Sequence, residues 1–258
     1  MKYFKFIPLI FLIFSYYYCF NFVQRKKILF QQILNFKTYS QYYEDLILFC
    51  IFYDIEKGFY IDIGANDPDS LSVTKAFYLE GWKGINIEPL PEKFNFLLQK
   101  RPNDINLQIA VGKKKENSIL YLQGFGSTLK QDFSGNKNTT INIKIDTMLN
   151  VCKEFIKTDI DINFCKIDVE GWEKNVLLGF DFDNCRPQVF VIESTFPGTY
   201  IPCHASWEYL LLSNDYSFVY QYEINRFYVD NKIPSLKEKF KKIDKYIQIY
   251  EKNKENSK

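Results

Sequence analysis

Two acidic side chains at the ends of apolar segments indicate cofactor chemistry in the first half of the chain. Asp62 lies in the segment Phe59–Ile63, which runs into a turn at residues 64–67, and Glu88 ends the segment Ile85–Glu88. In α/β folds that bind nucleotides, a glycine turn follows a strand, and an acidic residue about 20 positions later accepts hydrogen bonds from ribose hydroxyls. We therefore predict that the chain binds a cofactor containing a nucleoside, with Glu88 on its ribose.

The turn after Asp62 favours a cationic cofactor over a dinucleotide. A dinucleotide site requires the glycines of G-x-G-x-x-G, and only Gly64 is present here. S-adenosylmethionine has no phosphate and carries a positive centre, which Asp62 or Asp67 would attract. Backbone amides between Gly64 and Asn66 would bind its carboxylate. The alternative for Asp62 alone is a carboxylate that caps a turn or a helix.

A second pair of acids, Asp168 and Glu170, closes the apolar segment Ile162–Val169. Alternate residues of a strand point to the same side, so both carboxylates can face one pocket. Methyl transfer from a sulfonium to a hydroxyl requires aligned reacting atoms and an acceptor for the hydroxyl proton. We expect Asp168 to lie near the cofactor and its transferred methyl group, and Glu170 to orient the substrate or act as the base. The alternative is that Glu170 begins a helix, where a carboxylate is favourable.

Four residues in the second half of the chain complete the candidate site. His204 is the only histidine and is expected in a loop, where it could act as a general base, although a single histidine is often incidental. Glu193, at the end of the next strand, is expected beside the substrate. Asn225 and Arg226 could hydrogen-bond a sugar or a carboxylate, with a turn and a salt bridge as an equal alternative. No metal is expected, because the chain has no Cys-x-x-Cys pair and one acidic pair offers too few ligands for magnesium.

The elements that must position these residues alternate between strand and helix patterns. Alternation of this kind predicts a parallel sheet with crossover helices. The expected order is strand 59–63, helix 69–80, strand 85–88, helix 92–100, strand 105–111, strand 140–145, a helix from 146, strand 162–169, a helix from 171, strand 188–193 and helix 207–212. Strands 217–222 and 226–229 then form an antiparallel hairpin at the edge of the sheet.

These motifs, taken together, resemble the FkbM family of S-adenosylmethionine-dependent methyltransferases. The matching segments run in order from about residue 40 to 230: Ser40-Gln-Tyr-Tyr-Glu44-Asp45, Phe59-Tyr-Ile-Asp62-Ile-Gly64-Ala-Asn66, Ser72-Val-Thr74, Gly81-Trp82-Lys-Gly84-Ile-Asn-Ile-Glu88-Pro89, Ala110-Val-Gly112, Ile145-Asp146-Thr147, Lys166-Ile-Asp168-Val-Glu170-Gly171, Trp207-Glu208 and Asn225-Arg226. The resemblance implies a class I methyltransferase fold, a Rossmann-like α/β fold with helices on both faces of a mostly parallel sheet. It also implies O-methylation of a hydroxyl on a carbohydrate or a related small acceptor. Asp67-Pro68-Asp69 departs from the more glycine-rich loop of many relatives.

The chain begins with an apolar segment. Residues 6–23 hold no charged side chain, and basic residues flank them on both sides. Eighteen residues are at the short end of a membrane span, and no small-x-small cleavage motif follows, so we expect a single hydrophobic helix that anchors the chain in a membrane rather than a cleaved signal. The positive-inside rule gives no orientation, because the two flanks carry equal positive charge.

The remaining organisation follows from charge and periodicity. Residues 1–27 form the expected anchor with its basic flanks, 28–39 a linker, 40–230 the catalytic domain, and 231–258 a Lys-rich amphipathic helical tail. A total of 33 basic and 31 acidic residues gives a net charge of +2, which is too balanced for a nucleic-acid-binding protein. Most of the six cysteines are expected to be small buried apolar residues.

Two other functions compete with methyl transfer. A nicotinamide-dependent oxidoreductase is disfavoured by the missing glycines. A non-catalytic, membrane-anchored domain that retains the fold would bind the cofactor weakly or not at all.

Overall fold

The computed structural model of the protein describes residues 27–122, 127–129 and 140–256. The chain divides into two compact units, residues 38–242 on the one hand and residues 1–37 with 243–258 on the other. Both sheets lie in the unit of residues 38–242. The expected hydrophobic helix at 6–23 lies outside the described residues. Among the described ones, no helix has the length and apolar character needed to span a bilayer.

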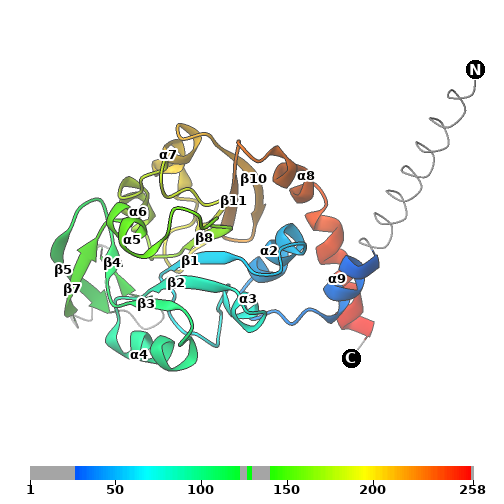
Figure 1. The fold of residues 1–258 in the computed structure, drawn as a ribbon, viewed down its shortest axis with the longest axis horizontal. Coiled ribbons are helices and arrows are strands. Elements are labelled where there is room, and N and C mark those ends of the chain that lie inside the picture. Colours follow the sequence, from blue (N-terminus) through cyan, green and yellow to red (C-terminus); the bar gives the residue numbers. More distant parts are fainter. Residues whose placement is uncertain (1–26, 123–126, 130–139, 257–258) are drawn as a thin grey trace, which may run out of the picture. The chain divides into compact units, whose positions relative to one another are not determined.

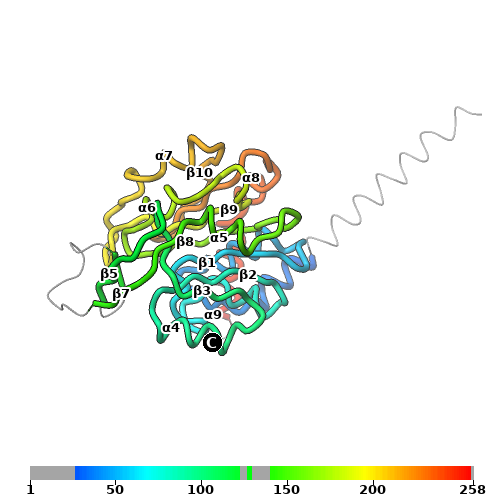
Figure 2. The backbone as a smooth tube through the Cα atoms, turned by 60° about the vertical axis from the view of Figure 1, so that its left-hand side comes forward, coloured from blue at the N-terminus to red at the C-terminus, as the bar shows by residue number. Residues whose placement is uncertain are grey.

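A seven-stranded sheet organises the larger unit (Figures 1 and 2). Its order is β10 (Tyr216–Tyr222), β11 (Asn225–Asp230), β9 (Val189–Glu193), β8 (Phe164–Ile167), β1 (Phe59–Ile63), β2 (Lys83–Ile87) and β3 (Ile105–Leu107). The strands from β9 to β3 are parallel, and β11 is antiparallel to both of its neighbours. The predicted α/β fold with a mostly parallel sheet and a C-terminal antiparallel hairpin is therefore confirmed.

One face of this sheet packs against helices that follow the strands in the chain. Alternate strand residues such as Ile61 and Ile63 point to this face, because side chains alternate along a strand. They form one core with residues of α5 (Met148–Phe155), α6 (Glu173–Leu178) and α7 (Glu208–Leu212). Met148, Val176 and Leu211 are each completely buried in that core.

The opposite face is covered by α2 (Glu44–Phe52), α3 (Lys75–Leu79) and α8 (Pro234–Phe240). Phe52 of α2 and Phe77 of α3 surround Phe164 of β8, with ring centroids 6.3 and 4.9 Å from that ring. Phe240 of α8 lies 5.7 Å from Phe227 of β11. Helices therefore cover both faces, while the carboxyl ends of the strands remain available for a site.

A four-stranded sheet lies beside the first, in the order β4 (Ala110–Val111), β7 (Thr140–Asp146), β5 (Glu116–Leu122) and β6 (Ser127–Thr128). The prediction of one strand over residues 105–111 is wrong, because β3 and β4 belong to different sheets. Leu107 pairs with Ile87, the last residue of β2, so a continuing strand has no partner there. Pairing resumes at Ala110, opposite Ile145 of β7.

The predicted helix over residues 69–80 is also too long, since α3 covers only Lys75–Leu79. The carboxylate of Asp67 accepts hydrogen bonds from the backbone amides of Asp69 and Ser70, which forms a local turn instead of a helix. Buried Arg101, which follows α4 (Pro91–Lys100), holds the Pro68 carbonyl at 2.6 Å. Segment 66–74 is thus an irregular loop beside the site.

Three other expectations change in detail. Residues 28–35 of the expected linker are helical, with Leu29 and Ile33 buried. The expected tail contains two helices, α8 and α9 (Ile243–Asn256), because its buried positions are divided between the two compact units. Cys152 and Cys185 form a disulfide with a Cα–Cα separation of 5.9 Å, so these two cysteines are cross-linked and not merely buried.

Candidate active site

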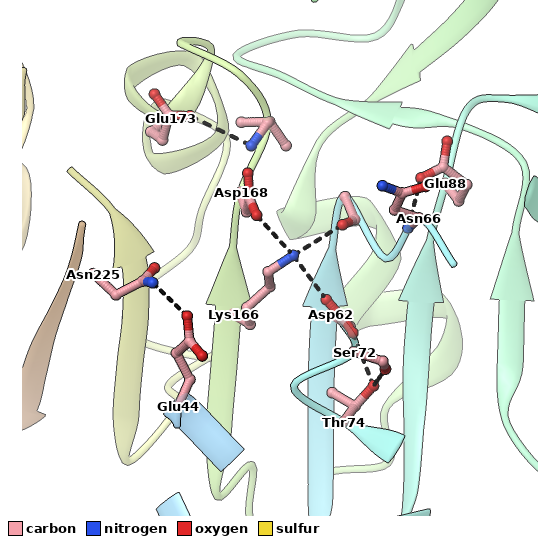
Figure 3. A network of polar contacts seen from close by, with 12 residues as sticks. Glu44, Asp62, Asn66, Ser72, Thr74, Glu88, Lys166, Asp168, Glu173 and Asn225 are labelled. Carbon is pink, nitrogen blue, oxygen red and sulfur yellow. Dashed lines mark hydrogen bonds and ion pairs between the residues drawn. The ribbon is translucent and has the colours of Figure 1, made fainter. Parts of the chain in front are cut away.

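Polar side chains gather at the carboxyl ends of β1, β2, β8 and β9 (Figure 3). From β1 the chain continues to β2 on one side, while β8, which follows later in the chain, pairs with the other side of β1. Ligands of open α/β sheets bind where the strand order reverses in this way, beyond the carboxyl ends of the strands. The candidate site therefore lies where the topology of this sheet predicts one.

Asp62 is buried near the end of β1, with one carboxylate oxygen hydrogen-bonded and the other without a hydrogen bond. Its Oδ2 accepts a 2.8 Å hydrogen bond from the hydroxyl of Thr74. Its Oδ1 makes no hydrogen bond to any described residue, and its nearest cation is the ammonium of Lys166 at 3.6 Å. A buried carboxylate oxygen without a hydrogen bond is costly in isolation, and a cationic or hydrogen-bonding ligand would satisfy it.

The turn after Asp62 depends on glycine. Gly64 has a φ of +78°, and a Cβ atom there would stand 1.9 Å from the carbonyl oxygen of Asp168. The amides of Gly64 and Ala65 both donate to the Ile87 carbonyl, at 3.0 and 3.1 Å. The turn thus joins the ends of β1 and β2 and brings the chain close to the end of β8.

Glu88 lies immediately after β2 and is 5% exposed. Its Oε2 accepts from the Asn66 amide at 2.9 Å and its Oε1 from the Leu90 amide at 2.8 Å. Desolvation raises its pKa, while these two amides and the charge of Lys166 act in the opposite direction. Each carboxylate oxygen has a second lone pair, so the orientation of Glu88 is fixed and its capacity to accept further hydrogen bonds is retained.

Asp67 is committed to local structure. It accepts hydrogen bonds from two amides of its own turn, and it forms an ion pair of 3.1 Å with Lys93 of α4. Partial desolvation opposes ionisation, but those amides and Lys93 outweigh it and lower the pKa of Asp67. Of the two acids expected to attract a cationic cofactor, Asp62 is therefore the one with an oxygen free of hydrogen bonds.

Lys166 of β8 joins the two halves of the site (Figure 3). Its ammonium donates to the Gly64 carbonyl at 3.0 Å and lies 3.3 Å from Oδ2 of Asp168. Asp168 follows β8, and its side chain is 40% exposed, so it reaches the opening of the site. The sequence pattern predicted that Asp62 and Asp168 would lie close together, and Lys166 bridges them.

Glu170 and Glu193 place two further carboxyl groups beside Asp168. Desolvation, followed by repulsion from Asp168, raises the pKa of Glu170 to about 7. The same two causes raise the pKa of Glu193 strongly, so its carboxyl group is neutral at physiological pH. Oε2 of Glu193 is buried without a hydrogen-bond partner among the described residues. This part of the site thus offers one titratable carboxyl group and one neutral carboxyl group.

Glu173 holds the loop that carries Asp168 and Glu170. It accepts from the Gly171 amide at 3.0 Å and from the Val169 amide at 3.4 Å. The alternative considered for Glu170 was that it begins a helix. In the structure it is Glu173 that begins α6. Glu170 itself lies in the preceding turn with a φ of 54°.

Asn225 and Arg226 point to opposite faces of the sheet, because they are neighbours on β11. Asn225 donates a 2.6 Å hydrogen bond to Glu44 of α2 and pairs in register with Glu193. Arg226 instead forms a 2.8 Å ion pair with Glu208 of α7. Only Asn225 therefore shares the face of Asp62, and the alternative of a salt bridge describes Arg226.

His204 begins a short 3₁₀ helix, η2 (His204–Ser206). Burial, followed by repulsion from Arg226, lowers its pKa, and Glu208 acts in the opposite direction. These two charges belong to the Arg226 side of the sheet. The structure thus places His204 near Arg226 and Glu208 and beside the backbone of Ser194.

Sequence reasoning missed three residues of this arrangement, namely Lys166, Glu44 and Glu173. Lys166 was visible as a single charged residue inside an apolar strand, two positions before Asp168 and thus on the same face. Glu44 lies in one of the matching motifs without a predicted role, and Glu173 gave no signal, because their contacts depend on how the beginnings of α2 and α6 pack against β11 and against the preceding loop.

No cluster of three or more His, Cys, Asp or Glu side chains suited to a metal ion is found among residues 27–122, 127–129 and 140–256. The carboxylates instead surround an ammonium and leave negative charge in excess. An arrangement of this kind favours a positively charged ligand.

The fold and the geometry define an α/β protein with a cluster of buried carboxyl groups at the carboxyl ends of its parallel strands. The family model "Methyltransferase FkbM domain" matches residues 62–248, which is most of the chain. The chain therefore belongs to the FkbM methyltransferase family, as its motifs predicted. The match includes Asp62, Glu88, Lys166 and Asp168.

Comparisons with individual proteins add little. No curated protein matches the chain. Among solved structures, the METTL16 MTase domain (crystal form 2) is similar at 15% identity and a TM-score of 0.39, over 72% of this chain. The chain spans 65% of the length of that structure. A likeness this distant supports no conclusion about function, so the assignment depends on the family match.

Proposed function

We propose that this methyltransferase uses S-adenosylmethionine as donor and methylates a hydroxyl group of a carbohydrate or a related small acceptor. The observation that carries the proposal is the pairing of two buried carboxylates at neighbouring strand ends. Asp62 has an oxygen without a hydrogen bond, and Glu88 is held by two amides with lone pairs to spare. Between them, Gly64 lets the turn pass close to the Asp168 carbonyl, where a Cβ atom would clash.

The residues present fit this cofactor. Glu88 would accept hydrogen bonds from its ribose hydroxyls, and Asp62 would attract its cationic end. The turn 64–66 contains one glycine and no lysine or arginine, so nothing there favours a pyrophosphate. When bound, S-adenosylmethionine supplies a methyl group on a positively charged sulfur.

The protein must hold the acceptor in line and remove its proton. Glu193 and Asn225 supply a neutral carboxyl and an amide at paired positions of β9 and β11, where they can orient an acceptor hydroxyl. Glu170 then accepts the hydroxyl proton, and its pKa of about 7 suits a base that works near neutral pH. Asp168 lies between them and orients the acceptor oxygen toward the cofactor.

The test is transfer of a labelled methyl group by the full chain in mild detergent to a panel of glycans and free sugars. We expect labelled product with the parent and at least about a hundredfold less with Glu170→Gln, because general-base catalysis contributes about that much or more. Glu92→Gln is the matched control, since Glu92 is an exposed acid on α4. Labelled product in equal amounts from Glu170→Gln and the control would refute the role of Glu170. Absence of transfer to every hydroxyl acceptor, with transfer to amines or thiols, would refute O-methylation.

We propose further that residues 6–23 anchor the chain in a membrane, with the catalytic unit on the oxidising side. The Cys152–Cys185 disulfide supports this orientation, because disulfides persist in secretory and extracellular compartments and are rare in the cytosol. Blocking all free thiols while the cells are lysed in denaturant, followed by reduction and mass labelling, should label two cysteines in the purified chain. Complete blocking of these two cysteines before reduction would contradict the proposed orientation.

A further inference from the structure

Lys166 is a basic residue where the sequence pattern calls for an apolar one. It belongs to β8, whose other members, Phe164, Cys165 and Ile167, are completely buried. The Lys166 side chain is only 11% exposed. A buried ammonium is costly unless it is paired and hydrogen-bonded, so its position requires an explanation.

The ammonium has three hydrogens and three acceptors around it. The Gly64 carbonyl is at 3.0 Å, Asp168 Oδ2 at 3.3 Å and Asp62 Oδ1 at 3.6 Å. These acceptors come from the turn after β1, from the loop after β8 and from the end of β1. Lys166 therefore connects the part of the site expected to hold the cofactor with the part expected to face the acceptor.

The charges facing Lys166 are otherwise acidic. Asp62 and Asp168 contact it, and Glu193, Glu88 and Glu170 also interact with its charge. Asp62 comes from β1, Glu88 from the end of β2, Asp168 and Glu170 from the loop after β8, and Glu193 from β9. One ammonium thus faces five carboxyl groups and compensates part of the charge of those that are ionised.

We propose that Lys166 is a positioning residue that prepares the site for its cofactor mainly through its charge. It compensates Asp62 and Asp168 in the absence of ligand, and it holds the Gly64 carbonyl so that the turn keeps its place. This inference rests on the proposed function, in which the site binds S-adenosylmethionine.

Removal of the charge has a specific consequence. Without the ammonium, Asp62 and Asp168 are like charges with no partner, and Asp62 is buried. A buried carboxylate in that situation takes up a proton. Binding of the cationic end of the cofactor then requires the proton to leave. Cofactor binding should therefore release about one proton more in a neutral variant than in the parent.

The experiment is calorimetric titration of the full chain in mild detergent with S-adenosylhomocysteine, which retains the adenosine, ammonium and carboxylate groups and is not consumed. Titrations in buffers of different ionisation enthalpy count the protons released. Lys166→Gln keeps a hydrogen-bond donor for the Gly64 carbonyl and removes the charge, whereas Lys166→Arg keeps the charge. Circular dichroism and thermal unfolding establish that each variant is folded.

We expect the parent and Lys166→Arg to bind with the same proton release. We expect Lys166→Gln to bind at least about tenfold more weakly near pH 7 and to release about one proton more than the parent, with binding that recovers as the pH rises. If Lys166→Gln does not fold, the same pair of variants is compared in an Asp168→Asn background, which lacks one of the two carboxylates that Lys166 contacts. The same order of affinities is expected there.

The possible failures are distinguishable. If the parent does not bind S-adenosylhomocysteine, the proposed cofactor is wrong. If the parent binds, Lys166→Gln could weaken binding equally at all pH values and release no more protons than the parent. In that case Lys166 acts only through its hydrogen bonds, and the inference about its charge is overturned. Equal binding by parent and Lys166→Gln would overturn it as well.

Discussion

The disulfide between Cys152 and Cys185 should contribute a large share of the stability of the catalytic unit. It joins α5 to the segment before β9 and encloses β8, with a sequence separation of 33 residues. In the chain-entropy treatment, closing a loop of that length removes about 12.5 cal/mol/K from the unfolded chain, or about 3.7 kcal/mol at 25 °C. A small domain is stable by roughly 5–15 kcal/mol in total, so this loss would be readily measured.

The assay is urea unfolding of the full chain in mild detergent, followed by tryptophan fluorescence, with and without a thiol reductant. We expect the reductant, or the double variant Cys152→Ala/Cys185→Ala, to lower the free energy of unfolding by about 2–4 kcal/mol. Cys50→Ala is the matched control, because Cys50 is buried but free. Reductant should destabilise this control as much as the parent, and it should leave the double variant unchanged. An unfolding midpoint of the parent that does not respond to reductant would refute the reasoning.

Three further predictions follow from single residues. Gly64→Ala should abolish cofactor binding and lower the free energy of unfolding by at least about 1–3 kcal/mol, because the Cβ of the alanine would stand 1.9 Å from the Asp168 carbonyl at a φ of +78°. Titration calorimetry and thermal unfolding of the variant check this. Normal cofactor binding would contradict it. Burial raises the pKa of Glu173 to about 7, so in the parent this group stabilises the fold fully below about pH 4.5 and loses that contribution as the pH rises through about 7. Glu173→Gln should therefore gain stability relative to the parent by roughly 2–3 kcal/mol between these pH values, and a pH-independent difference in urea unfolding would be inconsistent with that titration. Arg226→Met should lower the unfolding temperature, since it leaves Glu208 without its ion-pair partner. It should change the KM for the cofactor less than twofold. A large change in this KM would indicate that Arg226 contributes to the binding site.

Spacing along the sequence was sufficient to predict the central pair of the site. Asp62 and Glu88 end neighbouring parallel strands, and such ends meet at one edge of a sheet whatever the details of the loops. The prediction for Asp168, which was placed near the cofactor, used the alternation of strand side chains in the same way. These positions are determined by strand order and by the two-residue repeat of strand side chains, both of which can be inferred from the apolar pattern.

The remaining parts depend on contacts that no local pattern encodes. Asp67 and Asp62 are the same residue type five positions apart, and only the position of Lys93 on α4 shows that Asp67 has a structural partner. The opposite directions of Asn225 and Arg226 arise because both belong to β11, which the hairpin prediction began one residue too late and ended one residue too early. The Cys152–Cys185 pair could not be selected from six cysteines without the packing of α5 against the sheet.

The most direct test of the account is calorimetric titration of the full chain in mild detergent with S-adenosylmethionine and, separately, with NAD. We expect the parent to bind S-adenosylmethionine and to give no heat with NAD. Glu88→Ala should weaken that binding by at least about tenfold, because a carboxylate hydrogen bond to a hydroxyl contributes about 1.5–3 kcal/mol. Glu92→Ala, the exposed control, should bind as the parent does. Binding of neither cofactor by the folded parent would support a non-catalytic domain and contradict the account, and binding of NAD in place of S-adenosylmethionine would replace methyl transfer with oxidoreduction.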